Sequence, residues 1–165
     1  SVGLSVRPAR KNWKRAIDKA LKEDKVSCLV ESLIEGRELT VPVLEKNGVP
    51  HAMSVIEIRT ASGLFDYNAK YHDTRTQEIC PAPISRHATR RAKRLAMKAH
   101  AVLGCRGYSR TDMILDELGR LRVLETNTLP GLTSASLLPK AAKEEGMELY
   151  ELLERILAHA ATDRK

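Results

Sequence analysis

The spacing of hydrophobic positions changes several times along the chain, and each change marks an expected element. Residues 10–23 carry apolar side chains at helical spacing, which predicts an amphipathic helix. A short apolar run over 26–34 predicts a strand. Residues 38–45 alternate between apolar and polar. Asn47-Gly48 then supplies two residues that tolerate positive φ, so we expect a hairpin whose return strand covers 49–59.

The middle of the chain begins with a stretch that has no period. Residues 60–84 predict a long loop, and a loop of this length in a compact domain is usually functional or mobile. A second helix is expected over 85–103, with Ser85 as its N-cap. Its buried stripe is expected to consist of Ala88, Ala92, Leu95, Ala96, Ala99 and Leu103. Two further strands are expected over 106–116 and 120–127.

The C-terminal part continues with a turn and two helices. Residues 128–133 form the expected turn, a helix starts at about Ser134, and the last helix covers about 147–160. The complete order is helix, strands, loop, helix, hairpin and two helices. This order predicts an α+β fold, an antiparallel sheet with flanking helices.

Length and composition restrict the class of protein. The 165 residues suffice for one domain over 1–165, and 42% hydrophobic with 30% charged residues is a globular balance. No apolar run is long enough to span a bilayer, so we expect no membrane insertion. The short polar start is unlike a signal peptide and lacks methionine, so we expect the chain to begin inside a longer gene product. Three separated cysteines, Cys28, Cys80 and Cys105, suggest a reduced intracellular protein with cysteines as core fillers.

The formal charge of +7 suggests an anionic partner, either nucleic acid or a nucleotide or phosphate. Many of the cations lie between Arg86 and Lys98 on one expected helix, where such a run is more often a solvated face than a binding site. Aromatic residues make up only 4%, which leaves few platforms for stacking nucleobases. A basic nucleic-acid-binding module therefore stays as an alternative of another class, and the salt dependence of any such binding would test it.

Four polar residues on the second expected hairpin carry the strongest chemical signal. Arg110 and Asp112 share one face of their strand, and Glu125 and Asn127 share one face of the next. A register centred on Leu118-Gly119 would place Asp112 opposite Glu125. Two carboxylates this close raise one another's pKa unless a cation lies between them, and oxygen ligands suit Mg²⁺. The alternative is an exposed ion-pair ladder of Arg110 with Asp112 or Glu125.

The turn that follows this hairpin offers a second binding feature. Gly131 allows a backbone N–H to approach a ligand closely, and the following helix N-terminus favours an anion. Ser134 or Ser136 could add a hydroxyl group. Capping of the helix by Thr133 or Ser134 would explain the same hydroxyls without any ligand.

These segments resemble the C-terminal part of the D-alanine–D-alanine ligases, which are members of the ATP-grasp superfamily. The signature consists of Gly104-Cys105-Arg106-Gly107-Tyr108-Ser109-Arg110-Thr111-Asp112 and Leu124-Glu125-Thr126-Asn127-Thr128-Leu129-Pro130-Gly131-Leu132-Thr133. Residues 29–38 resemble the family's adenine-binding segment, 65–71 its mobile loop, and 1–3 the end of its phosphate loop. The resemblance covers essentially the whole chain and implies the C-terminal portion of an ATP-grasp domain.

The resemblance implies a catalytic and metal-binding role for the hairpin. Asp112, Glu125 and Asn127 match the ligands of two Mg²⁺ (or Mn²⁺) ions that bridge the ATP phosphates. Arg110 matches the arginine that stabilises the oxyanion of the tetrahedral intermediate, together with the backbone N–H of Gly131. Ser136 matches the serine that holds the carboxylate of the second D-alanine.

The resemblance also implies a nucleotide site. Glu31 matches an adenine contact and Glu38 the ribose contact. The main chain of Ser32, Leu33 and Ile34 would serve the adenine edge, and Leu124 falls among the nucleotide contacts.

On the mobile loop, Lys70 would reach an ATP phosphate and Tyr71 would help to close the site. This pair favours D-alanine as the second substrate. Leu64 stands where an aromatic residue often stacks on adenine, which implies weaker nucleotide binding.

The implied reaction joins two D-alanines through an acyl phosphate for peptidoglycan synthesis in the cytoplasm. The expected partners are ATP and D-alanine, without nucleic acid or membrane, in a homodimer when the protein is full-length. The family's N-terminal domain, central lobe and first phosphate-loop serine have no counterpart here, so we expect this chain alone to be inactive. The nearest rival is another ATP-grasp carboxylate–amine ligase, such as a D-alanine–D-lactate ligase.

Overall fold

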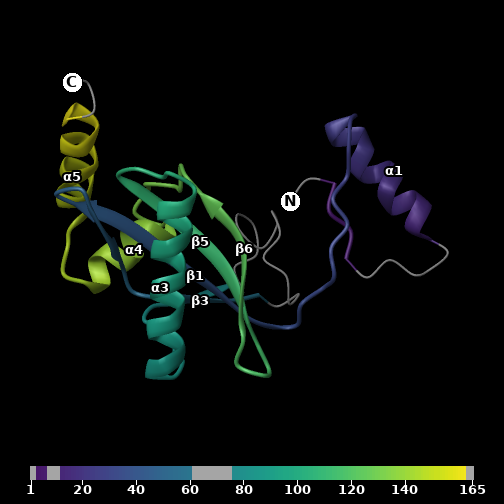
Figure 1. Ribbon diagram of the computed structural model, residues 1–165, viewed down its shortest axis with the longest axis horizontal. Helices are drawn as coiled ribbons and strands as arrows, with labels where there is room; N and C mark the ends of the chain where they lie inside the picture. Colours follow the sequence, from purple (N-terminus) through teal and green to yellow (C-terminus); the bar gives the residue numbers. More distant parts are fainter. Residues whose placement is uncertain (1–2, 7–11, 61–75, 163–165) are drawn as a thin grey trace. The chain divides into compact units, whose positions relative to one another are not determined.

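The computed structural model describes residues 3–6, 12–60 and 76–162 (Figure 1). The chain divides into two compact units. One unit comprises Ser1–Glu35 and Thr60–Thr76, and the other comprises Gly36–Arg59 and Gln77–Lys165. Each unit is described by itself below. The expectation of a single domain over 1–165 stays a prediction.

The first unit contains helix α1 (Trp13–Asp24), as the helical spacing predicted. The helix ends at Asp24, and the next residue, Lys25, caps it with a left-handed backbone conformation and an N–H that donates to the Leu21 carbonyl. No α1 residue is buried, so its apolar stripe stays accessible within the described part of the unit. The predicted strand over 26–34 is wrong, because these residues adopt no strand and pair with no described strand. Val26 is 86% exposed there, and an apolar run that neither pairs with a neighbouring strand nor buries its side chains gains nothing from the strand conformation.

The second unit is built on an antiparallel sheet. Its strands run in the order β4-β3-β1-β5-β6, and β2 pairs with β1 beyond β3. The strand bounds are β1 (Gly36–Lys46), β2 (Val49–Ala52), β3 (Ile56–Arg59), β4 (Gln77–Ile79), β5 (Tyr108–Asp116) and β6 (Leu121–Asn127). The central strand β1 pairs with β5 over nine residue pairs, from Gly36↔Asp116 to Leu44↔Tyr108. This long pairing fixes which side chains of β1 lie beside the polar residues of β5.

The first hairpin confirms the predicted turn and corrects the strand after it. Asn47 and Gly48 both have positive φ, as the turn requires. The predicted return strand over 49–59 is broken between β2 and β3, where Met53 N–H donates to the Pro42 carbonyl and the Val55 carbonyl accepts from Ala82.

The predicted loop over 60–84 is wrong at residues 77–79. Strand β4 forms there and pairs with β3. Three residues at a sheet edge are too few to show a period in the sequence. Residues 61–75 of the expected loop lie outside the described residues.

Helix α3 (Arg86–Val102) covers one face of the sheet (Figure 1). The Ser85 hydroxyl accepts from Ala88 N–H at 3.2 Å, which confirms the predicted N-cap. Ala92 and Ala96 pack on the apolar side chains of β1 and β5, and the small alanines permit close approach. The predicted stripe is wrong at its end, because Leu103 is 62% exposed. His100 is buried instead, with its Nδ1 2.8 Å from Ser109 Oγ and its Nε2 3.1 Å from Glu45 Oε1.

Helices α4 (Leu137–Glu144) and α5 (Leu149–Thr162) complete the second unit. Leu138, Ala141 and Leu152 are fully buried, and Lys140 pairs with Glu78 of β4. The helix predicted from Ser134 starts three residues later. Its N-cap is Ser136, not Thr133 or Ser134, because the backbone turns first through a Ser136 N–H to Thr133 carbonyl bond of 2.8 Å.

The three cysteines are free, as predicted, but they are half-buried and so are not core residues. Burial, with the nearby carboxylates of Glu144 and Glu145, raises the pKa of the Cys80 thiol to about 11. That thiol therefore stays protonated at neutral pH, which makes it a poor nucleophile.

Candidate active site

The second hairpin has the predicted pairing at its polar residues, but the predicted centre at Leu118-Gly119 is wrong by one residue next to the turn, where Leu115 pairs with Leu121. Asp112 pairs with Glu125 and Arg110 pairs with Asn127, so all four polar residues share one face of the β5–β6 ladder. This face is opposite to the one that packs on α3, because Met113 belongs to the α3 core. The register shifts directly beyond Asp112, where Met113 pairs with Val123 and Leu124 is the extra residue of a bulge. A bulge at this point increases the twist of the edge strand beside the acidic pair.

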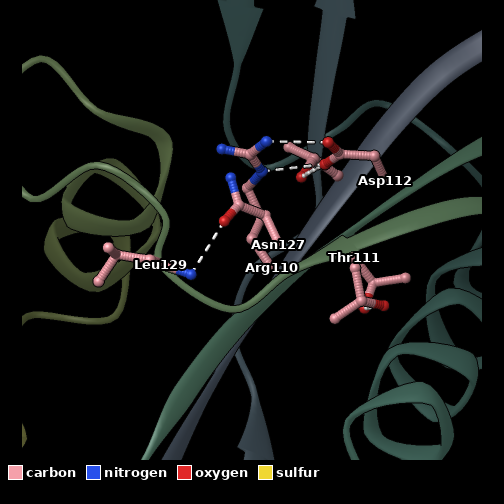
Figure 2. A network of polar contacts seen from close by, with 7 residues as sticks. Arg110, Thr111, Asp112, Asn127 and Leu129 are labelled. Carbon is pink, nitrogen blue, oxygen red and sulfur yellow. Dashed lines mark hydrogen bonds and ion pairs between the residues drawn. The ribbon is translucent and has the colours of Figure 1, made fainter. Parts of the chain in front are cut away.

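Arg110 and Asp112 form a buried, two-pronged ion pair (Figure 2). Arg110 Nε donates to Asp112 Oδ1 at 2.9 Å, and Nη2 donates to Oδ2 at 2.8 Å. Thr40 Oγ1 of β1 donates to the same Oδ1 at 2.5 Å. The exposed fractions are 8% for Arg110, 7% for Asp112 and 0% for Thr40. The sequence alternative of an Arg110–Asp112 pair is thus confirmed, but the predicted exposure of that pair is wrong.

The two partners on β6 are more accessible. Glu125 is exposed, and Asn127 is half-buried. Asn127 Oδ1 accepts from Leu129 N–H at 2.9 Å, which shapes the turn after the strand (Figure 2). The face therefore presents one exposed carboxylate beside one buried, arginine-bound carboxylate.

The donor chemistry of this face fits a hard divalent cation. An ionised carboxylate offers about four lone-pair sites, and the described contacts of Asp112 use three of them. Oδ1 takes two of these bonds, so the free site is on Oδ2. The Asn127 oxygen accepts a single described bond, and Glu125 adds a solvent-facing carboxylate. Among the described residues there is no group of three or more His, Cys, Asp or Glu that could hold a metal, so a cation here needs the amide and other oxygens.

The turn after β6 brings two other predicted residues together. A side-chain carbon added to Gly131 would lie 2.6 Å from Ser136 Oγ, so a larger residue here would require the Ser136 hydroxyl to move. Ser136 Oγ lies 2.8 Å from Thr133 Oγ1 and makes no capping bond to α4. The Ser136 hydroxyl therefore lies at the start of α4 but accepts no hydrogen bond from the backbone N–H groups of the helix.

The remaining predicted residues fall in three places. Glu38 is half-buried on β1, two residues from Thr40 and on the same face. Leu124 is exposed in the bulge. Residues 31–34 belong to the first unit, where Glu31, Ser32 and Leu33 are exposed and Ile34 is half-buried. Leu64, Lys70 and Tyr71 lie outside the described residues.

Sequence reasoning missed Thr40 at this site. The residue is 72 positions from Asp112 in the chain, so no local spacing connects them. A signal was nevertheless present: Thr40 is a small hydroxyl residue between the apolar Leu39 and Val41, on the strand face that also carries Glu38. Polar residues at buried strand positions need a partner, and that requirement could have directed attention to it.

Known proteins share both the sequence and this architecture. The family model described as "D-ala D-ala ligase C-terminus" matches residues 1–158. The D-alanine–D-alanine ligase of Mannheimia succiniciproducens is 40% identical over 161 residues, which cover 98% of this chain and 51% of that protein.

Two solved structures superpose on the chain. The D-alanine–D-alanine ligase of Bacillus anthracis complexed with ATP has a TM-score of 0.66 and 30% identity, covering 81% of this chain and 41% of that one. The VanG D-Ala:D-Ser ligase of Enterococcus faecalis has a TM-score of 0.73 and 30% identity, covering 90% of this chain and 43% of that one.

The antiparallel sheet with its flanking helices is thus the C-terminal portion of an ATP-grasp fold, as predicted. The chain belongs to the D-alanine–D-alanine ligase family and matches the C-terminal part of it. It spans about half the length of the curated relatives that it matches.

Proposed function

We propose that this chain is the ATP- and metal-binding portion of a ligase that joins two D-alanines for peptidoglycan synthesis. The observation that carries the proposal is the buried Arg110–Asp112 pair beside Glu125 and Asn127, on a ladder that pairs Asp112 with Glu125 and Arg110 with Asn127. A purely structural ion pair would not require a second carboxylate opposite Asp112. The family membership supports the same conclusion.

In the proposed reaction, the carboxylate of the first D-alanine takes the γ-phosphoryl group of ATP, and the amine of the second then displaces phosphate. Asp112, Glu125 and Asn127 would hold two Mg²⁺ ions, which offset the charge of the ATP phosphates when bound. Arg110 would face the negative charge that develops on the reacting carbonyl oxygen, with the N–H of Gly131 beside it. Ser136 would hold the carboxylate of the second D-alanine.

The nucleotide contacts belong to the same proposal. Glu31 and the main chain of 32–34 would bind adenine, Glu38 would bind ribose, and Leu124 would pack against the nucleotide. Lys70 and Tyr71 would act from the loop outside the described residues. The solved relative with bound ATP supports a nucleotide in this fold.

A different second substrate is the closest competing function. The VanG structure, described as a D-Ala:D-Ser ligase, has the highest TM-score of the solved structures compared above. Since that architecture accompanies D-serine as the second amino acid, we keep D-serine as an alternative to D-alanine, beside the D-lactate that the sequence already left open.

The setting of the activity is also proposed. ATP as a substrate implies the cytoplasm, and the full-length protein is expected to be a homodimer without nucleic acid as a partner. No helix in the described part of the chain is long and apolar enough to cross a bilayer.

We expect a fusion of the N-terminal half of the M. succiniciproducens ligase to this chain to release phosphate from ATP in the presence of D-alanine. The chain alone should show little or no release, because it spans about half of its relatives. Parallel reactions with D-serine or D-lactate as second substrate would identify the preferred one. A folded fusion without amino-acid-dependent release would refute the proposed ligase function, and rapid release by the chain alone would refute its dependence on an added N-terminal half.

A further inference from the structure

We propose that Thr40 is a positioning residue that fixes the Asp112 carboxylate for cation binding, an inference that rests on the proposed function of the site. Thr40 lies on the central strand β1 and pairs directly with Asp112 in the β1–β5 register. Its side chain has no exposure to solvent. An ionised carboxylate can only accept, so the Thr40 hydroxyl donates to Asp112 Oδ1 at 2.5 Å.

Thr40 determines which carboxylate oxygen remains open. Oδ1 accepts from both Thr40 and Arg110 Nε, whereas Oδ2 accepts only from Arg110 Nη2 among the described residues. The terminal torsion of an aspartate is broad and roughly two-fold, so the carboxylate can turn unless hydrogen bonds hold it. The hydroxyl thus holds Oδ1 inward and leaves the free site on Oδ2.

Thr40 matters most when Arg110 is engaged elsewhere. In the proposed reaction the Arg110 guanidinium stabilises charge on the substrate. Any Arg110 N–H group that turns to that charge no longer donates to Asp112. Of the two described residues that hold the carboxylate, only Thr40 would then remain. It is anchored in the middle of a strand that is paired on both sides, so its backbone cannot shift easily.

Stability alone does not explain a hydroxyl at this position. On its other side Thr40 pairs with Ile56, which is fully buried and apolar. Valine has nearly the same shape and favours strands equally. Arg110 already gives both Asp112 oxygens a donor, so a valine at 40 would leave neither oxygen without a partner.

Thr111 provides a matched control. It neighbours Asp112 on β5, has no exposure, and its Oγ1 lies 3.1 Å from Thr126 Oγ1. Figure 2 shows its side chain pointing away from Arg110 and Asp112. Thr111→Val therefore removes a comparable hydroxyl contact from the same ladder without touching the carboxylate.

The test is titration of this chain with MnCl2, with free Mn²⁺ followed by electron paramagnetic resonance. We expect Thr40→Val to raise the Kd for Mn²⁺ about 10-fold, the scale on which partners of metal ligands act. Thr40→Ser keeps the hydroxyl and should stay within about 2-fold of the unmodified chain, as should Thr111→Val. Thr40→Ala serves as a second hydroxyl-free variant if Thr40→Val does not fold.

An unchanged Kd in the hydroxyl-free variants would overturn the inference, as would equal weakening by Thr111→Val or no rescue by Thr40→Ser. These results would leave the proposed metal site standing, provided that Asp112→Asn still abolishes binding. No Mn²⁺ binding by the unmodified chain, or binding that survives Asp112→Asn, would instead refute the metal site itself and the role of Thr40 with it.

Discussion

Replacing Arg110 with lysine is expected to lower the kcat of the fusion ligase about 100-fold or more, the usual effect of removing one donor to a developing oxyanion. Lysine keeps the charge but cannot reproduce the fork that now bonds both oxygens of Asp112. Because the proposed role belongs to the transition state, kcat should fall more than the KM for ATP rises. Steady-state phosphate release at varied ATP and D-alanine measures both parameters.

Arg122→Lys is the matched control for this change. Arg122 is exposed on the neighbouring strand β6, so its replacement should leave kcat within about 2-fold. Near-ultraviolet circular dichroism would verify that each variant keeps its tertiary packing. Equal kcat values for the two variants would contradict the role given to Arg110.

Glu57→Gln is expected to reduce the free energy of unfolding by about 2–3 kcal/mol at pH 7, somewhat below the usual cost of breaking a buried pair because its arginines are partly solvated. Glu57 is only 2% exposed. Arg37 bonds its two oxygens at 2.6 and 2.9 Å, and Arg59 Nη2 lies 2.8 Å from Oε2. The hydrogen bond from Arg37 lowers the pKa of this carboxyl, although burial opposes the shift, and Arg59 lowers it further.

The same pair predicts a pH dependence. A carboxyl with a lowered folded pKa contributes stability that is present above its unfolded pKa, about 4.3, and is lost as the pH falls through the folded pKa. The difference between the unmodified chain and Glu57→Gln should therefore be full at pH 7 and shrink at pH values below about 4. Urea unfolding of the two chains at pH 7 and again below about pH 4 measures this difference in the free energy of unfolding.

Arg59→Gln is the milder comparison, because Arg59 is half-exposed and Arg37 would still hold the carboxylate. Its cost should stay below about 1 kcal/mol. A difference between Glu57→Gln and the unmodified chain that does not change with pH would argue against an ionised pair.

The hairpin was predictable because its information is local. The turn and the two strands follow from short-range patterns, but the register nearest the turn would place Asp112 opposite Leu124. The bulge at Leu124, which the sequence does not reveal, shifts the pairing and brings Asp112 opposite Glu125. Short-range patterns also gave the turn at Asn47-Gly48 and the cap at Ser85, which depend on one or two residues each. Family resemblance added the roles that spacing could not supply.

The errors arose where distant parts of the chain decide the structure. Residues 26–34 are apolar enough for a strand, but no described strand pairs with them. Strand β4 exists because β3 offers it an edge, which its own three residues do not reveal. Thr40 and Asp112 meet only because β1 and β5 pair across 72 residues, and Arg37 meets Glu57 for the same kind of reason.

The central claim is that the β5–β6 hairpin is a nucleotide–metal site. Calorimetric titration of ATP with Mg²⁺ into this chain, beside the Asp112→Asn/Glu125→Gln double variant, tests it most directly. We expect the chain to bind ATP–Mg²⁺ and the double variant to lose that binding while it keeps its fold. Binding that is equally tight in the double variant would contradict the claim, because neither carboxylate would then be needed.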